Sequence, residues 1–340
     1  MVIVSCMYSF FWRVFFPTFA AASSAFAAGP IKSFKPPYDT VGSIERFGPA
    51  IDALIPANAK IEKLAEGFTW SEGPAWWPQG QALIFSDVPQ NVAYRWTEAD
   101  GVTVFLQPSG FTGDKFEGRE SGSNGITVDN QGRLVLCQHG DRRVARYDAD
   151  KKMFVAVADR FKGNRFNSPN DVCCDRAGNV FFTDPPYGMQ TKTVSEIGFN
   201  GVYRAAPEGK VTLITRELER PNGVALSLDQ HTLYVSNTEG RTVILAIELH
   251  DDGTPGASRV FFDMTPLMNK GRPGAPDGLR VDKAGNLWAT GPGGVLVLSP
   301  EGSHLGTILT GQPTANCTFG ADGAVLYITA NSQLLRVRLK

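Results

Sequence analysis

A short pattern recurs six times along this chain and constrains its fold more than any other feature. Each copy has a polar head residue, a short apolar stretch, a turn rich in Asp and Gly, and a second apolar stretch. The head residues are Glu72, Asn124, Asn170, Asn222, Asp277 and Asn316, spaced 52, 46, 52, 55 and 39 residues apart. Two short strands joined by such a turn form a β-hairpin, and a repeat of about 40–50 residues is typical of a β-propeller. The sequence therefore predicts an all-β fold, a six-bladed β-propeller.

The first 28 residues have the features of a secretory signal peptide. They combine Arg13, an apolar run rich in Phe and Ala, and the small-residue end Ala25–Ala28. A membrane anchor is the weaker alternative, because Arg13 and Pro17 interrupt the apolar run well short of the about 20 residues that a spanning helix needs. We expect export to the periplasm or outside the cell, and no membrane association after cleavage.

The chain between the signal peptide and the first repeat differs from the rest. Residues 29–58 are rich in Pro and Gly and have little periodicity, which predicts an extended arm outside the propeller of residues 59–340. Ala59–Ala65 is expected to form a strand. Pairing this strand with the last one, Gln333–Leu339, would close the ring and remove an exposed sheet edge.

Charge and cysteine content narrow the partners and the chemistry. The 33 Lys and Arg residues nearly balance 34 Asp and Glu residues without a basic cluster, which argues against a nucleic-acid partner. The cysteines beyond the signal peptide are Cys137, Cys173, Cys174 and Cys317. They lie in apolar strands, so buried free thiols are favoured over a disulfide, and their spacing is not that of a zinc site.

The head residues are the candidates for chemistry, whereas the turn aspartates are expected to be structural. Equivalent positions in six repeats would point towards the central channel from one end. Asn-Gly and Asp-Gly are also ordinary turn dipeptides, but Glu72 is a poor turn residue. Carboxylate and amide oxygens suit a hard cation, and Glu72 with Asp277 would balance a divalent charge. We expect one divalent cation, Ca²⁺ first, with Mg²⁺, Mn²⁺ or Zn²⁺ as alternatives.

Several phrases at the heads resemble the SMP-30/gluconolactonase/LRE-like family over roughly residues 61–340. The phrases are Ser71–Pro74, Ser168–Asp171, Phe182–Pro185, Pro221–Gly223 and Pro276–Gly278. The resemblance implies a six-bladed propeller that holds a divalent metal through Glu72, Asn170, Asn222 and Asp277. It also implies hydrolysis of a small sugar lactone, while some relatives with this ligand set hydrolyse organophosphates.

Substrate contacts are expected from residues around the channel mouth. The candidates are Asn124, Asn170, His139, Asp184 and Tyr187, although an exposed loop position is an alternative for His139. The loops Gly110–Ser121 and Tyr187–Phe199 are expected to cover the site, and their sequences match no pattern.

The expected mechanism uses the metal to stabilise the carbonyl oxygen of the lactone while water attacks. Asp277 is the candidate general base, and its direct attack as a nucleophile is an alternative. A non-catalytic propeller that binds a ligand or partner, and a quinone-dependent sugar dehydrogenase, are the rival functions. The sequence does not distinguish between oligomeric states.

Overall fold

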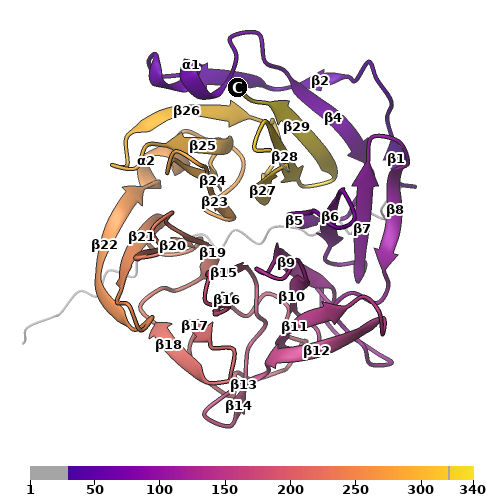
Figure 1. The fold of residues 1–340 in the computed structure, drawn as a ribbon, viewed down its shortest axis with the longest axis vertical. Helices are drawn as coiled ribbons and strands as arrows, with labels where there is room; N and C mark the ends of the chain where they lie inside the picture. The colour runs from indigo at the N-terminus through magenta and orange to yellow at the C-terminus, as the bar shows by residue number, and fades with distance from the viewer. Residues whose placement is uncertain (1–29, 321) are drawn as a thin grey trace, which may run out of the picture.

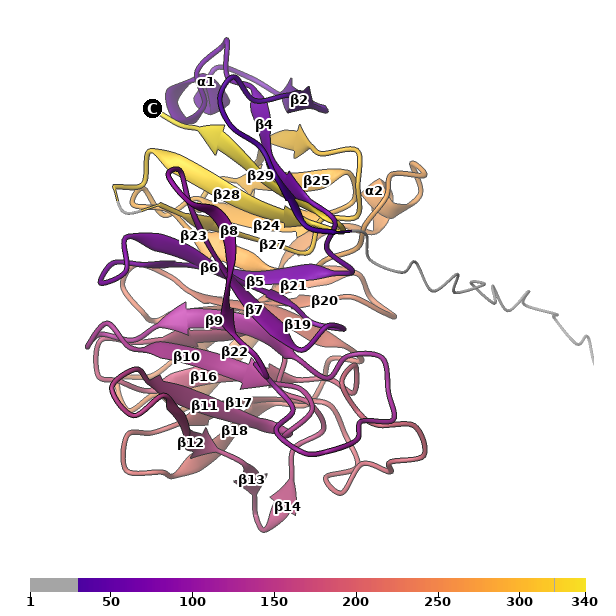
Figure 2. The same ribbon diagram turned by 90° about the vertical axis from the view of Figure 1, so that its right-hand side faces the viewer.

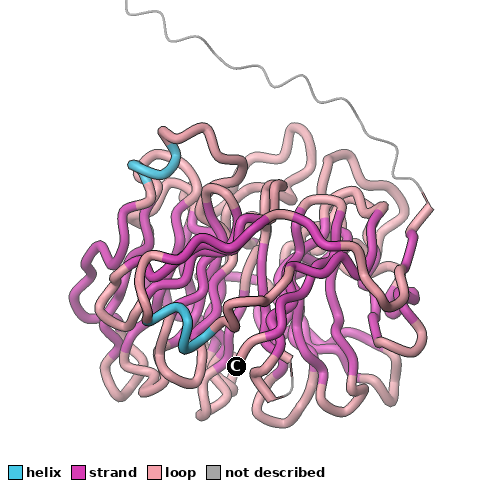
Figure 3. Tube along the Cα trace, turned by 90° about the horizontal axis from the view of Figure 1, so that it is seen from above, coloured by secondary structure: helices cyan, strands magenta, loops and turns pink. Residues whose placement is uncertain are grey.

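The computed structural model describes residues 30–320 and 322–340, so the predicted signal peptide lies outside the described residues. Six antiparallel sheets surround a central channel (Figure 1). In side view the strands form a layer between two faces made of loops (Figures 2 and 3). The prediction of an all-β, six-bladed β-propeller is confirmed.

Blades 1 to 3 each contain four strands in sequence order, innermost strand first. Blade 1 consists of β5 (Ser71–Trp77), β6 (Ala82–Asp87), β7 (Val92–Thr97) and β8 (Gly101–Leu106). Blade 2 consists of β9 (Ser123–Val128), β10 (Leu134–Gln138), β11 (Arg143–Asp148) and β12 (Met153–Ala158). Blade 3 consists of β15 (Val172–Cys174), β16 (Val180–Asp184), β17 (Gly201–Ala205) and β18 (Val211–Thr215). A small hairpin of β13 (Arg160–Phe161) and β14 (Asn164–Arg165) precedes blade 3.

Blades 4 to 6 repeat this order, and the last two also take strands from the arm. Blade 4 consists of β19 (Pro221–Leu226), β20 (Thr232–Asn237), β21 (Val243–Leu249) and β22 (Pro255–Asp263). Blade 5 consists of β23 (Leu279–Val281), β24 (Leu287–Gly291), β25 (Gly294–Leu298), β26 (His304–Leu309) and the arm strand β3 (Ser43–Arg46). Blade 6 consists of β27 (Asn316–Phe319), β28 (Val325–Ala330), β29 (Gln333–Arg338) and β4 (Ile61–Glu66).

The ring closes as expected, through a strand from the start of the chain. β4 runs antiparallel to β29, with Ile61 opposite Val337 and Ala65 opposite Leu334. The arm takes a larger part than the predicted outer wrapping. Its strands β1 (Lys32–Ser33) and β2 (Thr40–Val41) pair with β4, and β3 extends blade 5. These additions cover the edges that blades 5 and 6 would otherwise expose.

Residues 30–320 and 322–340 contain two short helices, α1 (Ala50–Leu54) in the arm and α2 (Thr265–Met268) after blade 4. Within the described part of the chain, no helix is long and apolar enough to cross a membrane.

The hydrophobic core lies between neighbouring blades. In one cluster, Val135 and Cys137 of blade 2 pack with Val172, Phe182 and Tyr203 of blade 3. Each blade buries apolar side chains on both faces, so a separate cluster of this kind lies between every pair of neighbouring blades. Cys137, Cys173, Cys174 and Cys317 are free thiols, as predicted, but only Cys137 and Cys317 are buried, whereas Cys173 and Cys174 are half-buried.

The turn aspartates are structural. Asp282 Oδ1, for example, accepts hydrogen bonds of 2.9 Å from the backbone N–H groups of Ala284 and Asn286. Asp129, Asp175, Asp229 and Asp322 accept backbone N–H groups of their own turns in the same way. The head residues, at the opposite ends of the innermost strands, are therefore the ones available for chemistry.

Candidate active site

Five of the six head residues meet at one end of the central channel, around a cavity of about 300 Å³. They come from the first five blades and are Glu72, Asn124, Asn170, Asn222 and Asp277. Trp70, Glu120, Tyr187, Thr238, Gly274, Ala275, Pro313 and Thr314 complete the lining. Asn316, the sixth head, is buried and lies outside this lining, and its Oδ1 accepts the backbone N–H of Cys317 at 2.9 Å.

Hydroxyl groups at the ends of the second strands hold the head residues in place. Each hydroxyl donates to the backbone carbonyl of the head residue in a following blade. The pairs are Ser86 with Asn124 (2.9 Å), Thr183 with Asn222 (2.6 Å) and Ser236 with Asp277 (2.6 Å). Blades 1, 3 and 4 thus each hold the head residue of the next blade in place at the cavity.

The glycine after a head residue permits this close approach of neighbouring blades. A Cβ atom on Gly73, whose φ is +52°, would lie 2.0 Å from the carbonyl oxygen of Asn124. A Cβ atom on Gly223 would lie 2.1 Å from the carbonyl oxygen of Asp277. Atoms do not approach so closely without displacement, so glycine is needed after Glu72 and after Asn222 for packing around the channel.

Three carboxylates line the cavity and repel one another. Burial and the nearby charges of Asp171 and Glu120 raise the pKa of Glu72 to about 8, although the N–H of Gly73 opposes the shift. Burial and the charge of Glu72 raise the pKa of Asp277 well above its ordinary value. A positive charge placed between these groups would relieve the repulsion.

The amide side chains form a hydrogen-bonded row beside the carboxylates. Asn124 Nδ2 donates to Asn170 Oδ1 at 2.9 Å, and Asn170 Nδ2 donates to Asn222 Oδ1 at 2.6 Å. Asn222 Nδ2 then donates to Thr238 Oγ1 at 3.0 Å. The row places amide oxygens from neighbouring blades beside each other at the edge of the cavity.

These residues fit a hard divalent cation. Among the described residues, the buried oxygens Asn124 Oδ1 and Asp277 Oδ1 have no hydrogen-bond partner. Buried polar atoms are normally paired, so these atoms are available for a ligand. The described residues contain no group of three or more His, Cys, Asp or Glu side chains that could hold a metal. Two carboxylates with two amides are a different donor set, and one that suits an oxygen-seeking cation.

Two of the predicted substrate contacts lie away from the cavity surface. Asp184 is fully buried, and its two oxygens each accept a backbone N–H at 2.8 Å, from Asn167 and Ser168. It therefore anchors the segment that leads to Asn170. His139 is also fully buried and lies behind Asn170, with 3.2 Å between His139 Nε2 and Asn170 Oδ1.

Tyr187 lines the cavity as expected for a substrate contact. Its hydroxyl is buried and has no hydrogen-bond partner within the described residues. The guanidinium of Arg220 lies over the ring, 5.4 Å from its centroid. The hydroxyl is therefore a donor available to a ligand in the cavity.

The cavity residues that the sequence prediction missed include Glu120, Trp70 and Thr238. Glu120 comes from the loop Gly110–Ser121, whose sequence repeats nowhere else in the chain. Trp70 lies two residues before the head residue Glu72 of blade 1, and Thr238 directly follows the second strand of blade 4. The other blades have different residue types at these positions, so only the position within the repeat could have indicated Trp70 and Thr238.

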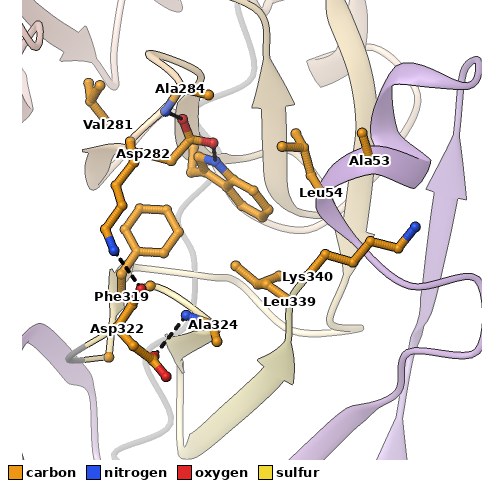
Figure 4. Close-up of a pocket in the computed structure, with 14 residues that line it drawn as sticks. Ala53, Leu54, Val281, Asp282, Ala284, Phe319, Asp322, Ala324, Leu339 and Lys340 are labelled. Carbon is orange, nitrogen blue, oxygen red and sulfur yellow. Dashed lines mark hydrogen bonds between the residues drawn. The ribbon is translucent and has the colours of Figure 1, made fainter.

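A second hollow, of about 350 Å³, lies at the turn end of blades 5 and 6 (Figure 4). Polar groups in its wall form hydrogen bonds with other residues of the wall. Asp282 Oδ2 accepts the indole N–H of Trp288 at 2.9 Å, and Lys283 Nζ donates to the carbonyl of Asp322 at 2.6 Å. The described residues of this hollow offer none of the converging, unpaired oxygens found in the channel site.

Comparison with known proteins places this geometry in a family. The chain is 40% identical over 310 residues to a gluconolactonase of Zymomonas mobilis, with 88% of this chain and 87% of that protein covered. It is 27% identical over 262 residues to a pentonolactonase of Haloferax volcanii, covering 76% of this chain and 80% of that protein. A solved gluconolactonase from Xanthomonas campestris superposes with a TM-score of 0.79 at 34% identity, over 92% of this chain and 98% of that one. The family model for the SMP-30/Gluconolactonase/LRE-like region matches residues 70–332, and the chain therefore belongs to this family.

Proposed function

We propose that the protein hydrolyses sugar lactones with the help of one divalent cation, Ca²⁺ being the expected ion. The observation that carries the proposal is the convergence of Glu72, Asn170, Asn222 and Asp277 on one cavity from four blades. The similarity to gluconolactonase and pentonolactonase proteins over most of the chain supports a lactone as the substrate.

The four converging residues are the proposed cation ligands. Glu72 and Asp277 supply negative charge, and Asn170 and Asn222 supply neutral oxygens. When bound, the cation would act as a Lewis acid that stabilises negative charge on the lactone carbonyl oxygen. The raised pKa of Glu72 supports this assignment, because a carboxyl group that is costly to ionise when buried gains most from a neighbouring cation.

Asp277 is the proposed general base. Its Oδ1 has no hydrogen-bond partner among the described residues, and it borders the cavity. Asp277 would accept a proton from water as the water oxygen bonds to the carbonyl carbon. The ring C–O bond then breaks, and the leaving oxygen takes the proton, which yields the hydroxy acid. Such proton transfer contributes typically about 10²- to 10⁴-fold in rate.

The cavity wall is suited to a polyhydroxylated ring. The hydroxyl of Tyr187 and the free oxygen of Asn124 offer a donor and an acceptor. Trp70 and Pro313 provide apolar surface in the same cavity. Sugar rings have hydroxyl edges and less polar faces, so we assign Tyr187 and Asn124 to the hydroxyls and Trp70 to a ring face.

A titration of released acid tests the proposal. Wild-type protein with Ca²⁺ is incubated with gluconolactone and with a pentonolactone, and spontaneous opening is subtracted. We expect enzymatic acid release, and a much slower rate for Asp277→Asn at the same Ca²⁺ concentration. Rates equal to the spontaneous ones on both lactones would contradict the proposed activity.

Export is a separate proposal that follows from the signal-peptide features of residues 1–28. Cleavage after the Ala-Phe-Ala sequence would place the new N-terminus near Ala28 or Gly29. N-terminal sequencing of protein from the periplasm or medium should find one of these residues. An intact Met1 or Met7 in that fraction would show that no cleavage occurs.

A further inference from the structure

His139 lies between a proposed ligand and a cavity carboxylate. Its imidazole is fully buried, with Nε2 3.2 Å from Asn170 Oδ1 and Nδ1 3.2 Å from Glu120 Oε2. The Nδ1 contact is close but not aligned as a hydrogen bond within the described residues. Glu120 is partly exposed, at 27%, and lines the cavity itself. The three side chains thus form a path from the cavity wall to the back of Asn170.

The ring of His139 is held between two loops, Gly110–Ser121 and Tyr187–Phe199, which contribute Glu120 and Tyr187 to the cavity. Glu120 belongs to the loop Gly110–Ser121. Gly188, in the loop Tyr187–Phe199, packs so closely that a Cβ atom there would lie 2.2 Å from His139 Cβ and 2.7 Å from Nδ1. The backbone N–H of His139 also donates to Gly122 O at 3.1 Å. The imidazole therefore has little freedom to move away from Asn170.

In the structure, the Asn170 amide does not have the orientation that the proposed role as a cation ligand requires. Its Oδ1 faces both Asn124 Nδ2 and His139 Nε2, while its Nδ2 donates to Asn222 Oδ1. A carbonyl oxygen has two lone pairs, so two donors occupy Asn170 Oδ1 completely. A half-turn of the amide would exchange its two ends and place Oδ1 beside Asn222 Oδ1, at the position where Nδ2 now lies 2.6 Å away. Two oxygen atoms at such a short distance repel each other unless a cation lies between them.

The half-turn requires a particular form of His139. The NH₂ group of Asn170 would then face both His139 Nε2 and the Asn124 amide. His139 Nε2 must therefore offer a lone pair rather than a hydrogen, and the Asn124 amide must turn as well, so that its Oδ1 accepts from Asn170. A neutral imidazole carries one N–H, so this hydrogen must be on Nδ1, where Glu120 Oε2 can accept it. Carboxylates commonly fix the tautomer of histidines next to metal sites in this way.

We propose that His139 and Glu120 are positioning residues that orient the Asn170 oxygen towards the cation, a proposal that rests on the cation site proposed above. Glu120 holds the hydrogen on Nδ1, Nε2 accepts from the Asn170 NH₂ group, and Asn170 and Asn222 present their oxygens together. The loops Gly110–Ser121 and Tyr187–Phe199 are thereby coupled to cation binding through the buried imidazole of His139.

Two substitutions at position 139 separate the two contacts. In His139→Gln the terminal amide reaches the place of Nε2 and can still accept from Asn170, but the contact with Glu120 is lost. In His139→Asn the amide reaches only the place of Nδ1, so the contact with Asn170 is lost. Both remove the ring and leave a similar gap. His304→Asn is the control, since that histidine contacts Gly306 and Thr307 in blade 5.

Calorimetric titration with Ca²⁺ at one fixed pH measures the Ca²⁺ affinity of each variant. We expect His139→Asn to weaken Ca²⁺ binding about 10- to 100-fold, the usual cost of losing a partner of a metal ligand. His139→Gln should bind much closer to wild type, and His304→Asn like wild type. Equal weakening in both position-139 variants would mean that only packing is lost and would overturn the proposal.

The tautomer of His139 gives a second readout, which is taken from the wild-type protein. The chain has four histidines, so ¹⁵N-histidine labelling gives few signals, and that of His139 is the one missing in His139→Gln. With Ca²⁺ bound we expect the Nδ1–H form, and an Nε2–H form there would overturn the proposal. If wild type binds no cation at all, the proposed cation site fails together with this inference. If wild type binds Ca²⁺ and both variants match it, only this inference fails.

Discussion

The hydroxyl of Ser236, near the end of β20, donates a hydrogen bond of 2.6 Å to the backbone carbonyl of Asp277. The hydroxyl oxygen of Ser236 also accepts a hydrogen bond of 2.8 Å from the backbone N–H of Gly223. One hydroxyl thus joins the head segment of its own blade to the head residue of the next. Its partners belong to the segments that carry two proposed ligands, Asn222 and Asp277. The hydroxyl of Ser236 therefore contributes both to the stability of the propeller and to the geometry of the site.

Ser236→Ala should reduce both stability and cation affinity. It leaves a buried N–H and a buried carbonyl without their partner, which costs about 1–3 kcal/mol of unfolding free energy. Denaturant unfolding and Ca²⁺ titration measure the two effects. Ser258→Ala is the control, because Ser258 lies on the exposed outer strand β22 of the same blade, where its hydroxyl donates to Glu217 Oε1 at 3.0 Å. Wild-type stability in Ser236→Ala would show that water replaces the hydroxyl.

Glu72→Gln should have opposite effects on the cation-free and cation-bound protein. Burial and neighbouring carboxylates raise the pKa of Glu72 to about 8, so keeping a carboxyl there costs stability at neutral pH. Without cation the variant should melt at a higher temperature than wild type. With Ca²⁺ it should gain less, since one of the two proposed charged ligands is gone. Thermal unfolding with chelator and with Ca²⁺ measures both, and an unchanged Ca²⁺-induced shift would remove Glu72 from the ligand set.

Asp277→Asn separates binding from proton transfer. The variant keeps an oxygen and nearly the same shape but can no longer accept a proton. At saturating Ca²⁺ we expect the site to fill while the turnover rate stays about two to four orders of magnitude below wild type. Asn222→Asp is the matched control, since it adds charge without touching the proposed base. Recovery of the full rate in Asp277→Asn at high Ca²⁺ would show that another group takes the proton.

Asp184 should make stability depend on pH in a predictable direction. Burial raises its pKa to about 7, against the opposing N–H groups of Asn167 and Ser168. The folded protein then holds this proton more tightly than the unfolded chain, so its contribution is fully present below about pH 4 and is lost as the pH rises to about 7. Asp184→Asn does not titrate, and its unfolding free energy should fall less over this window. Parallel curves for wild type and variant in urea unfolding would exclude the effect.

The parts of the fold and site that were predictable from sequence are those that repeat. The six head residues stand at equivalent positions, so one pattern predicted the blades, the end of the channel and the five head residues that line the cavity. The choice of Glu72, Asn170, Asn222 and Asp277 as the ligand set came from the family resemblance. The closure of the ring by β4 was predictable because an unpaired sheet edge is unfavourable.

The parts that were not predictable depend on packing between segments without a repeat. Asp184 ends its strand with a polar side chain, as a substrate contact would, yet two backbone N–H groups occupy its oxygens. Asp87 in blade 1 anchors Thr69 and Trp70 in the same way, so comparing the two blades would have revealed the role. Glu120 has no such counterpart. It reaches the cavity from a long loop whose course follows from its tertiary contacts alone.

The rate of lactone hydrolysis as a function of site occupancy tests the central claim most directly. Protein stripped of metal with chelator is titrated with Ca²⁺, and acid release from gluconolactone is recorded beside calorimetric binding. We predict a rate near the spontaneous one without cation and a rise that follows the filling of a single site, with both curves shifted together in Glu72→Gln. Full activity in the metal-stripped protein, or a rate that does not follow occupancy, would contradict a cation-dependent lactonase.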